Sequence, residues 1–225
     1  MLRETHDINS NSGIVDLSAA NHYSVKILIA FVDKNISGFR QYYLDKKDSD
    51  RENRISDFLV YYFNSCLLEE KDGFPPYNFG KNPTQKETAK ETDIGVVVLS
   101  KSTAPVTIIE FEAKRLSNSS THGEYVYGTR GGIERFKREH HGEHLTICGM
   151  FGYVQNETAN VWIDKINGWI KKMADENKDK TINWKYPDEK LEKLDGHKYK
   201  SLNSRPTKSH LTLYHYFIDL VPSAN

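Results

Sequence analysis

Cysteine is scarce in this chain. The sequence contains only two, Cys66 and Cys148, and neither belongs to a CxxC pair. This argues against a disulfide scaffold and against a thiolate zinc site. Both residues lie in apolar contexts, which indicates buried, reduced thiols and a cytoplasmic protein. Any metal ion would therefore be bound through oxygen ligands.

Long apolar runs and a surplus of one charge are also missing. No segment approaches the ~20 apolar residues that a membrane span needs, and the residues from Met1 to Asp7 lack the apolar region of a signal peptide. We therefore expect a soluble protein without a membrane partner. The 31 Lys and Arg balance the 31 Asp and Glu. Contact with nucleic acid would have to come from a local patch, because a neutral chain has no global positive field.

What is present is enough apolar material for a full core. Hydrophobic residues make up 37% of the 225 positions, with three Trp and ten Phe, and this length suits one globular domain. We expect a single domain, 1–225, with a helical extension over 1–50, a core over 50–175 and extra strands over 176–225.

The strongest helix signal follows residue 50. Its apolar residues recur at helical spacing, at positions 55, 58, 59, 62, 63, 66 and 67. Residues 23–32 are expected to form a short helix rather than a strand. The Gly- and Pro-rich residues 71–91 are expected to form a long irregular connection.

Two Val- and Ile-rich stretches, 92–99 and 106–114, are separated by a polar turn that contains Pro105, which predicts a β-hairpin. Further elements are expected along the rest of the chain: a basic helix over 133–139, a buried strand over 145–154, an amphipathic helix over 162–173, a charged helix end and loop over 171–195, and strands over 199–205 and 211–220. This order predicts an α/β fold with a mixed sheet between helices.

Charged residues occupy unusual places in the predicted hairpin. Because side chains alternate along a strand, Glu110, Glu112 and Lys114 share one face. Asp93 opens the neighbouring strand, and Glu52 extends the apolar stripe of the preceding helix. Carboxylate oxygens suit Mg²⁺, and a lysine beside them can polarise a metal-bound water and stabilise a developing negative charge.

This constellation resembles the PD-(D/E)XK, or restriction-endonuclease-like, nuclease superfamily. The residues that carry the likeness are Glu52 in a leading helix, Asp93, and Glu112-Ala113-Lys114. The resemblance implies an αβββαβ core in which Asp93 and Glu112 bind Mg²⁺ or Mn²⁺, Lys114 is the catalytic lysine and Glu52 assists. Thr92 stands where many members have proline.

In related nucleases, the helix after the lysine often contributes a basic residue to the site. The candidates for contact with nucleic acid are Arg130, Arg135 and Lys137, since a guanidinium can meet two phosphate oxygens at once. The alternative is that Arg135 and Lys137 only solvate a helix face. Glu110 has no place in the family pattern; it is an acid supporting the site, a substrate contact or a solvated edge residue. His215 is expected to be a structural core residue.

We therefore expect a Mg²⁺-dependent endonuclease or exonuclease, acting on DNA rather than RNA, in restriction, phage defence or repair. The alternative is a nuclease-fold module that binds nucleic acid or a protein without cutting, as part of a defence or repair assembly. The expected protein partner is a second copy in a homodimer or a member of a defence complex. Hydrolysis of a glycoside by Glu110 and Glu112 is disfavoured, because two acids on one strand cannot flank a bond from opposite sides.

Overall fold

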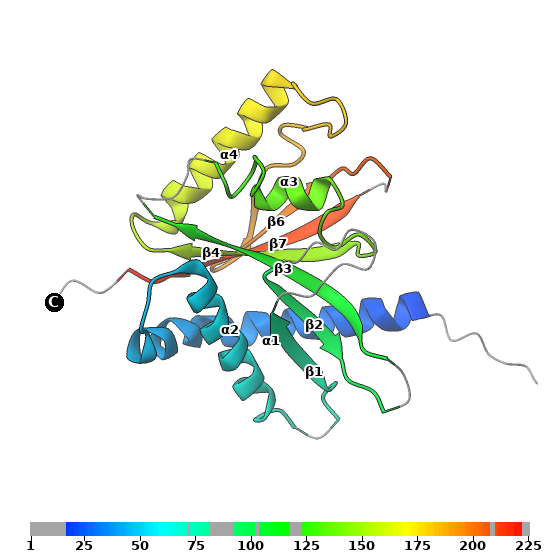
Figure 1. Ribbon diagram of the computed structural model, residues 1–225, viewed down its shortest axis with the longest axis vertical. Helices are drawn as coiled ribbons and strands as arrows, with labels where there is room; N and C mark the ends of the chain where they lie inside the picture. Colours follow the sequence, from blue (N-terminus) through cyan, green and yellow to red (C-terminus); the bar gives the residue numbers. More distant parts are fainter. Residues whose placement is uncertain are drawn as a thin grey trace, which may run out of the picture.

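The protein is an α/β molecule in which helices cover both faces of one seven-stranded mixed sheet (Figure 1). This confirms the expected fold class at that level. The computed structural model describes the following residues: 17–71, 73–81, 92–101, 104–117, 123–207 and 210–221. The first 16 residues, which belong to the extension expected over 1–50, lie outside them.

Two helices open the chain. The expected helix after residue 50 is α2, Glu52–Leu67. The other, α1, spans Leu17–Lys46 and is far longer than the short helix expected over 23–32. Its buried side chains Val32, Ile36 and Phe39 continue the helical spacing beyond that range and pack in the main core. The part of α1 from Val25 to Tyr43 therefore contributes side chains to the core.

The sheet has the strand order β1-β2-β3-β4-β7-β6-β5. Its strands are β1 Tyr77–Lys81, β2 Ile94–Val98, β3 Val106–Leu116, β4 Ile147–Val154, β5 Glu192–Asp195, β6 Lys198–Asn203 and β7 Leu211–Asp219. Neighbours are antiparallel except at β3–β4 and β4–β7, which are parallel. The predicted hairpin is confirmed as β2 and β3, with Ile94 opposite Phe111.

Two strands depart from the expected pattern. Residues 77–81, expected to be irregular, form β1 at one edge of the sheet, and residues 192–195, expected to be loop, form β5 at the other. The C-terminal strands do not form a separate layer, because β7 lies between β4 and β6 in the same sheet.

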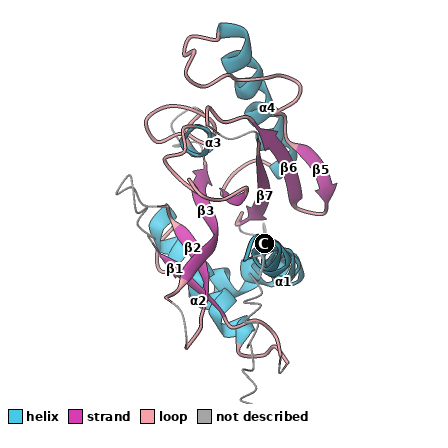
Figure 2. Cartoon of the chain, turned by 90° about the vertical axis from the view of Figure 1, so that its right-hand side faces the viewer, coloured by secondary structure: helices cyan, strands magenta, loops and turns pink. Residues whose placement is uncertain are grey.

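The helices divide between the two faces, as Figures 1 and 2 show. Helices α1 and α2 share one apolar cluster, whereas α3, Gly132–Lys137, and α4, Ala159–Glu176, share the other. Strand alternation links the layers, since adjacent residues such as Tyr153 and Val154 belong to opposite clusters. Within the described residues, no helix is long and apolar enough to cross a membrane.

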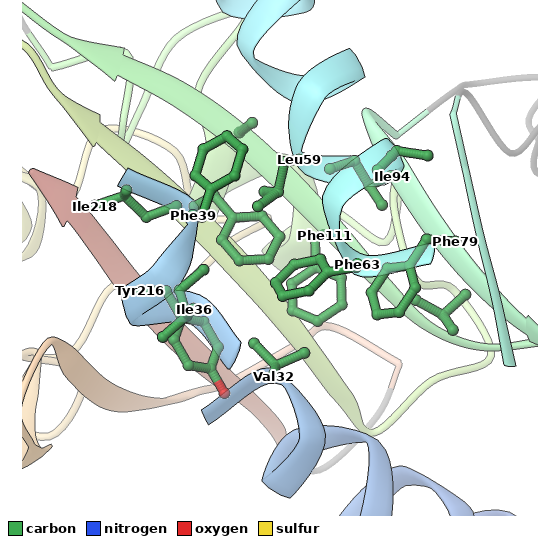
Figure 3. Close-up of a cluster of buried hydrophobic side chains, with 14 of the residues drawn as sticks. Val32, Ile36, Phe39, Leu59, Phe63, Phe79, Ile94, Phe111, Tyr216 and Ile218 are labelled. Atoms are coloured by element: carbon green, nitrogen blue, oxygen red, sulfur yellow. The ribbon is translucent and has the colours of Figure 1, made fainter. Parts of the chain in front are cut away.

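Aromatic rings fill the core between the sheet and α1 and α2 (Figure 3). Phe63 stacks on Phe79 with ring centroids 4.8 Å apart, and Phe111 stacks on Phe151 at 4.7 Å. Because Phe111 and Ala113 point into this core, their alternating neighbours Glu112 and Lys114 lie on the face that α3 and α4 cover. The fold thus delivers the charged residues of β3 to the side of the sheet opposite α1.

Candidate functional site

Three elements bring the four predicted site residues together. Lys114 Nζ lies 2.8 Å from Glu112 Oε1, its neighbour on the same face of β3, and 3.8 Å from Glu52 Oε1 at the first residue of α2. Asp93, immediately before β2, accepts a hydrogen bond on Oδ2 from the backbone N–H of Ala113, at 2.7 Å. The acids expected to cooperate therefore meet at one place on the sheet.

Local backbone structure fixes two of these carboxylates. The β2–β3 ladder ends at Ile94 and Phe111, and the carboxylate of Asp93 accepts from the backbone just beyond that pair. In the same way, Glu52 Oε2 accepts from the backbone N–H of Arg115, at 2.6 Å. Both acids are thereby held against β3, on either side of Lys114.

Lys114 and Glu112 are almost fully buried, with 7% and 1% of their surfaces exposed. Burial alone would lower the pKa of Lys114, but the neighbouring carboxylates of Glu112, Glu52 and Asp93 outweigh it, and the pKa is raised. The lysine is therefore a stable ammonium at neutral pH.

The pKa values of two carboxyl groups at the site, those of Asp93 and Glu52, are raised. Burial and then the charge of Glu112 raise the pKa of Asp93 to about 6. Burial likewise raises the pKa of Glu52. A nearby cation stabilises the charged form of carboxyl groups that lie close together in a partly buried site. These carboxylates therefore favour the binding of a cation.

The donors present fit a hard divalent cation. Asp93, Glu112 and Glu52 offer carboxylate oxygens, and Glu112 Oε2 is buried without a hydrogen-bond partner among the described residues, 3.4 Å from His141 Nε2. No cluster of three or more acidic, His or Cys side chains is already arranged as a metal site in the part of the chain that the structure describes. Mg²⁺ does not require such a cage, because it keeps several waters and uses one or two carboxylates.

The three basic residues expected to contact nucleic acid occupy different environments. Arg135 Nη1 lies 2.9 Å from Glu112 Oε1, so α3 does contribute a basic residue to this site. Arg130 is exposed beside Glu52 and Lys114.

Lys137 is fully buried, and its Nζ lies 2.5 Å from Glu189 Oε1. The expectation that Lys137 contacts nucleic acid was wrong, because a phosphate cannot reach it. The alternative of a solvated helix face was also wrong for this residue.

Glu110, which had no assigned role, is buried and connects β3 to the backbone at Gly142. Its Oε2 accepts a hydrogen bond from the backbone N–H of Gly142 at 2.8 Å, and only 4% of the residue is exposed. It is therefore not a solvated edge residue. His215 is the expected core residue: Tyr125 Oη lies 3.0 Å from Nδ1 and Ser201 Oγ 2.8 Å from Nε2.

A cleft of about 300 Å³ opens beside the cluster and includes Glu52 and Lys114 in its wall. Several of its other lining residues were not predicted to belong to a site, among them Arg51, Arg115, Trp162 and Trp169. Arg51 and Arg115 directly adjoin the predicted residues Glu52 and Lys114 in sequence, a signal that could have identified them. The sequence did not identify Trp162 and Trp169 as cleft residues, because their spacing is also that of residues on the buried face of a helix.

No family model, curated protein or solved structure matches the chain.

Proposed function

We propose that this protein is a divalent-metal-dependent nuclease with a restriction-endonuclease-like core. The succession α2-β1-β2-β3-α3-β4 gives the αβββαβ order of such a core. Its pairing supports the same proposal, since β1, β2 and β3 are antiparallel and β4 runs parallel to β3.

One observation carries the proposal. Asp93, Glu112, Lys114 and Glu52 come from three elements and converge on one place, beside an open cleft. Surface salt bridges stabilise a fold only weakly, and buried ones cost desolvation, so stability gives little reason to gather these charges here. Hydrolysis of a phosphodiester bond does need them together.

Each residue has a distinct part in this proposal. Asp93 and Glu112 would hold Mg²⁺ or Mn²⁺, with Glu52 completing the set directly or through water. When bound, the ion would supply an activated water and offset charge on the scissile phosphate. Lys114, held as an ammonium, donates hydrogen bonds to the attacking water or a phosphate oxygen. Arg135 positions Glu112, and exposed Arg130 contacts the nucleic-acid backbone.

The first test is cleavage of single-stranded DNA, duplex DNA and RNA by the purified protein in Mg²⁺ or Mn²⁺. We expect DNA to be cut, and Lys114→Ala to lower the rate at least about 100-fold, because that variant lacks the ammonium that stabilises the transition state. Lys193→Ala, which removes an exposed lysine on β5, serves as the matched control. Circular dichroism establishes that both variants fold. Cleavage by Lys114→Ala at the normal rate would refute the proposed role.

A second candidate is a nuclease-fold module that binds nucleic acid or a protein without cutting. It is favoured by the contacts of Glu112, whose Oε1 already lies within 2.9 Å of both Lys114 Nζ and Arg135 Nη1. Calorimetry with Mn²⁺ separates the two candidates. The nuclease requires binding that is lost in Asp93→Asn and Glu112→Gln, whereas the binding module requires no such dependence.

A further inference from the structure

We propose that the cleft beside Lys114 binds one nucleotide of a single-stranded nucleic acid, with its base against Trp169 and its phosphate on Arg51 and Arg130. This proposal rests on the nuclease assignment and specifies the form of its substrate. A duplex would be bound only where a base is unpaired or turned out of the helix.

Aromatic side chains form one wall of the cleft. Trp162 and Trp169 lie seven residues apart on α4, and thus on the same face of that helix. Trp162 is fixed: it is 5% exposed, Nε1 donates to the backbone oxygen of Asn156, and the Lys165 ammonium lies 4.5 Å from the ring centroid. Trp169 is only half-buried. The ring available to a base is therefore that of Trp169.

Positive charge dominates the other lining residues. Four are cationic, Arg51, Lys114, Arg115 and Arg130, against the two acids Glu52 and Glu124, which leaves a surplus of two positive charges. The Glu52 carboxylate is already occupied by Lys114 and the backbone of Arg115.

The guanidinium groups of Arg51 and Arg130 make no hydrogen bond or ion pair with the described residues. An exposed guanidinium at a concave site is well suited to a phosphate, which it meets with two donors. The cleft therefore combines an aromatic surface with two guanidinium groups that have no hydrogen-bond or ion-pair partner among the described residues, in a chain whose total charge is zero.

Size and position select a nucleotide over other anions. A volume of about 300 Å³ is at the small end of ligand sites and does not admit a base-paired helix. Stacking on an aromatic ring requires an exposed base face, which single strands provide. Because Lys114 and Glu52 line the same cleft as Arg130, a phosphate on Arg130 would lie in the cleft that the proposed catalytic residues border.

The test measures binding without cleavage, in EDTA, by the anisotropy of a labelled oligothymidylate and of a blunt duplex of equal length. We expect the single strand to bind at least tenfold more tightly. Trp169→Ala should weaken single-strand binding about 5- to 150-fold, the range expected for loss of one stacked base, and Trp169→Phe should retain most of the affinity. Tyr61→Ala, which removes an exposed aromatic ring from α2, is the control and should bind normally.

Tryptophan fluorescence gives a second readout that does not depend on a truncated side chain. Oligothymidylate should quench the emission of the unmodified protein, and Trp169→Phe should lose most of that quenching. Arg130→Gln should weaken binding of the single strand and of thymidine monophosphate, whereas Lys193→Gln should not.

The outcomes separate this proposal from the nuclease assignment. If cleavage depends on Lys114 but Trp169→Ala binds single strands normally, the nucleotide cleft is refuted and the nuclease stands. If no cleavage occurs but binding depends on Trp169, the cleft stands and the chain is a binding module. Equal affinity for the duplex and the single strand would also refute the proposal that the cleft binds a nucleotide of a single strand.

Discussion

Lys114 and Lys137, the two buried lysines among the described residues, differ in what surrounds them. Lys114 faces three carboxylates and a cleft, and their charges raise its pKa despite burial. Burial lowers the pKa of Lys137 despite the opposing effect of Glu189. Lys137 also reaches the backbone oxygen of Asn183, so it joins α3 to the segment around Trp184. Burial of a charge alone therefore does not mark a functional residue.

This difference predicts the effect of Lys137→Met. The substitution leaves Glu189 buried and without its ion partner, which should lower the free energy of unfolding by about 3–5 kcal/mol. Urea denaturation measures the loss, with exposed Lys193→Met as the control. Nucleic-acid affinity of the folded variant should not change. A stable variant with weakened nucleic-acid binding would instead restore Lys137 as a phosphate contact.

His215 predicts a dependence of stability on pH. Burial lowers its pKa from 6.5 to about 3, so the native state resists a proton that the unfolded chain accepts. Stability is therefore fully present above pH 6.5 and is lost as the pH falls from 6.5 toward 3, by up to about 1.4 kcal/mol per pH unit. Denaturant titrations from pH 7 to pH 4 should show a shallower loss in His215→Gln. The exposed residue His197 provides the control, and an unchanged slope in His215→Gln would contradict the prediction.

Three of the predicted site residues were placed by local periodicity. Glu112 and Lys114 share a face because strand side chains alternate, and Glu52 extends a helical stripe. Lys137 was misassigned because its partner Glu189 is 52 residues away, on a segment with no periodic signal. Sequence patterns specify the direction of a side chain better than the partner it meets.

At the scale of elements, a similar distinction separates what was predicted from what was missed. Helix α2 has a strong apolar period and strands β2 and β3 are rich in Val and Ile, so the helix and the hairpin were both predicted. The missed strands β1 and β5 are both at sheet edges, and all four residues of β5 are exposed. Such strands are specified by the neighbour that they pair with, so their own sequences carry little signal.

The loop before α3 is built on a close contact that only glycine permits. A Cβ on Gly131 would lie 2.4 Å from the carbonyl carbon of Tyr127, and backbone atoms cannot move aside easily. Gly131 also caps α3, which carries Arg135, and directly follows Arg130. The position of both arginines therefore depends on this glycine.

Gly131→Ala should consequently lower the free energy of unfolding by about 1–3 kcal/mol, as overpacking does, and weaken nucleic-acid binding. Thermal or urea denaturation checks the first effect and anisotropy the second. Gly168→Ala is an informative control, because a Cβ there meets nothing within 4 Å. That helical substitution should stabilise α4 by about 1 kcal/mol. Normal stability and binding in Gly131→Ala would show that the loop can adapt.

For the whole molecule, the important electrostatic fact is the contrast between a net charge of zero and a cleft with two surplus positive charges. A neutral protein does not attract a polyanion over long distances. Binding should therefore depend on a few contacts inside the cleft. This differs from proteins that cover a duplex with a broad basic surface.

The salt dependence of binding tests this picture quantitatively. For single strands, the logarithm of the affinity falls with the logarithm of salt concentration by about 0.7 for each phosphate neutralised. One nucleotide phosphate neutralised in the cleft predicts a slope of about −0.7 for oligothymidylate, and Arg130→Gln should flatten it. The measurement is anisotropy in EDTA at several KCl concentrations, with Lys193→Gln as the control. A slope steeper than about −3 would mean that a wider basic surface contacts the strand, because the cleft alone cannot neutralise that many phosphates.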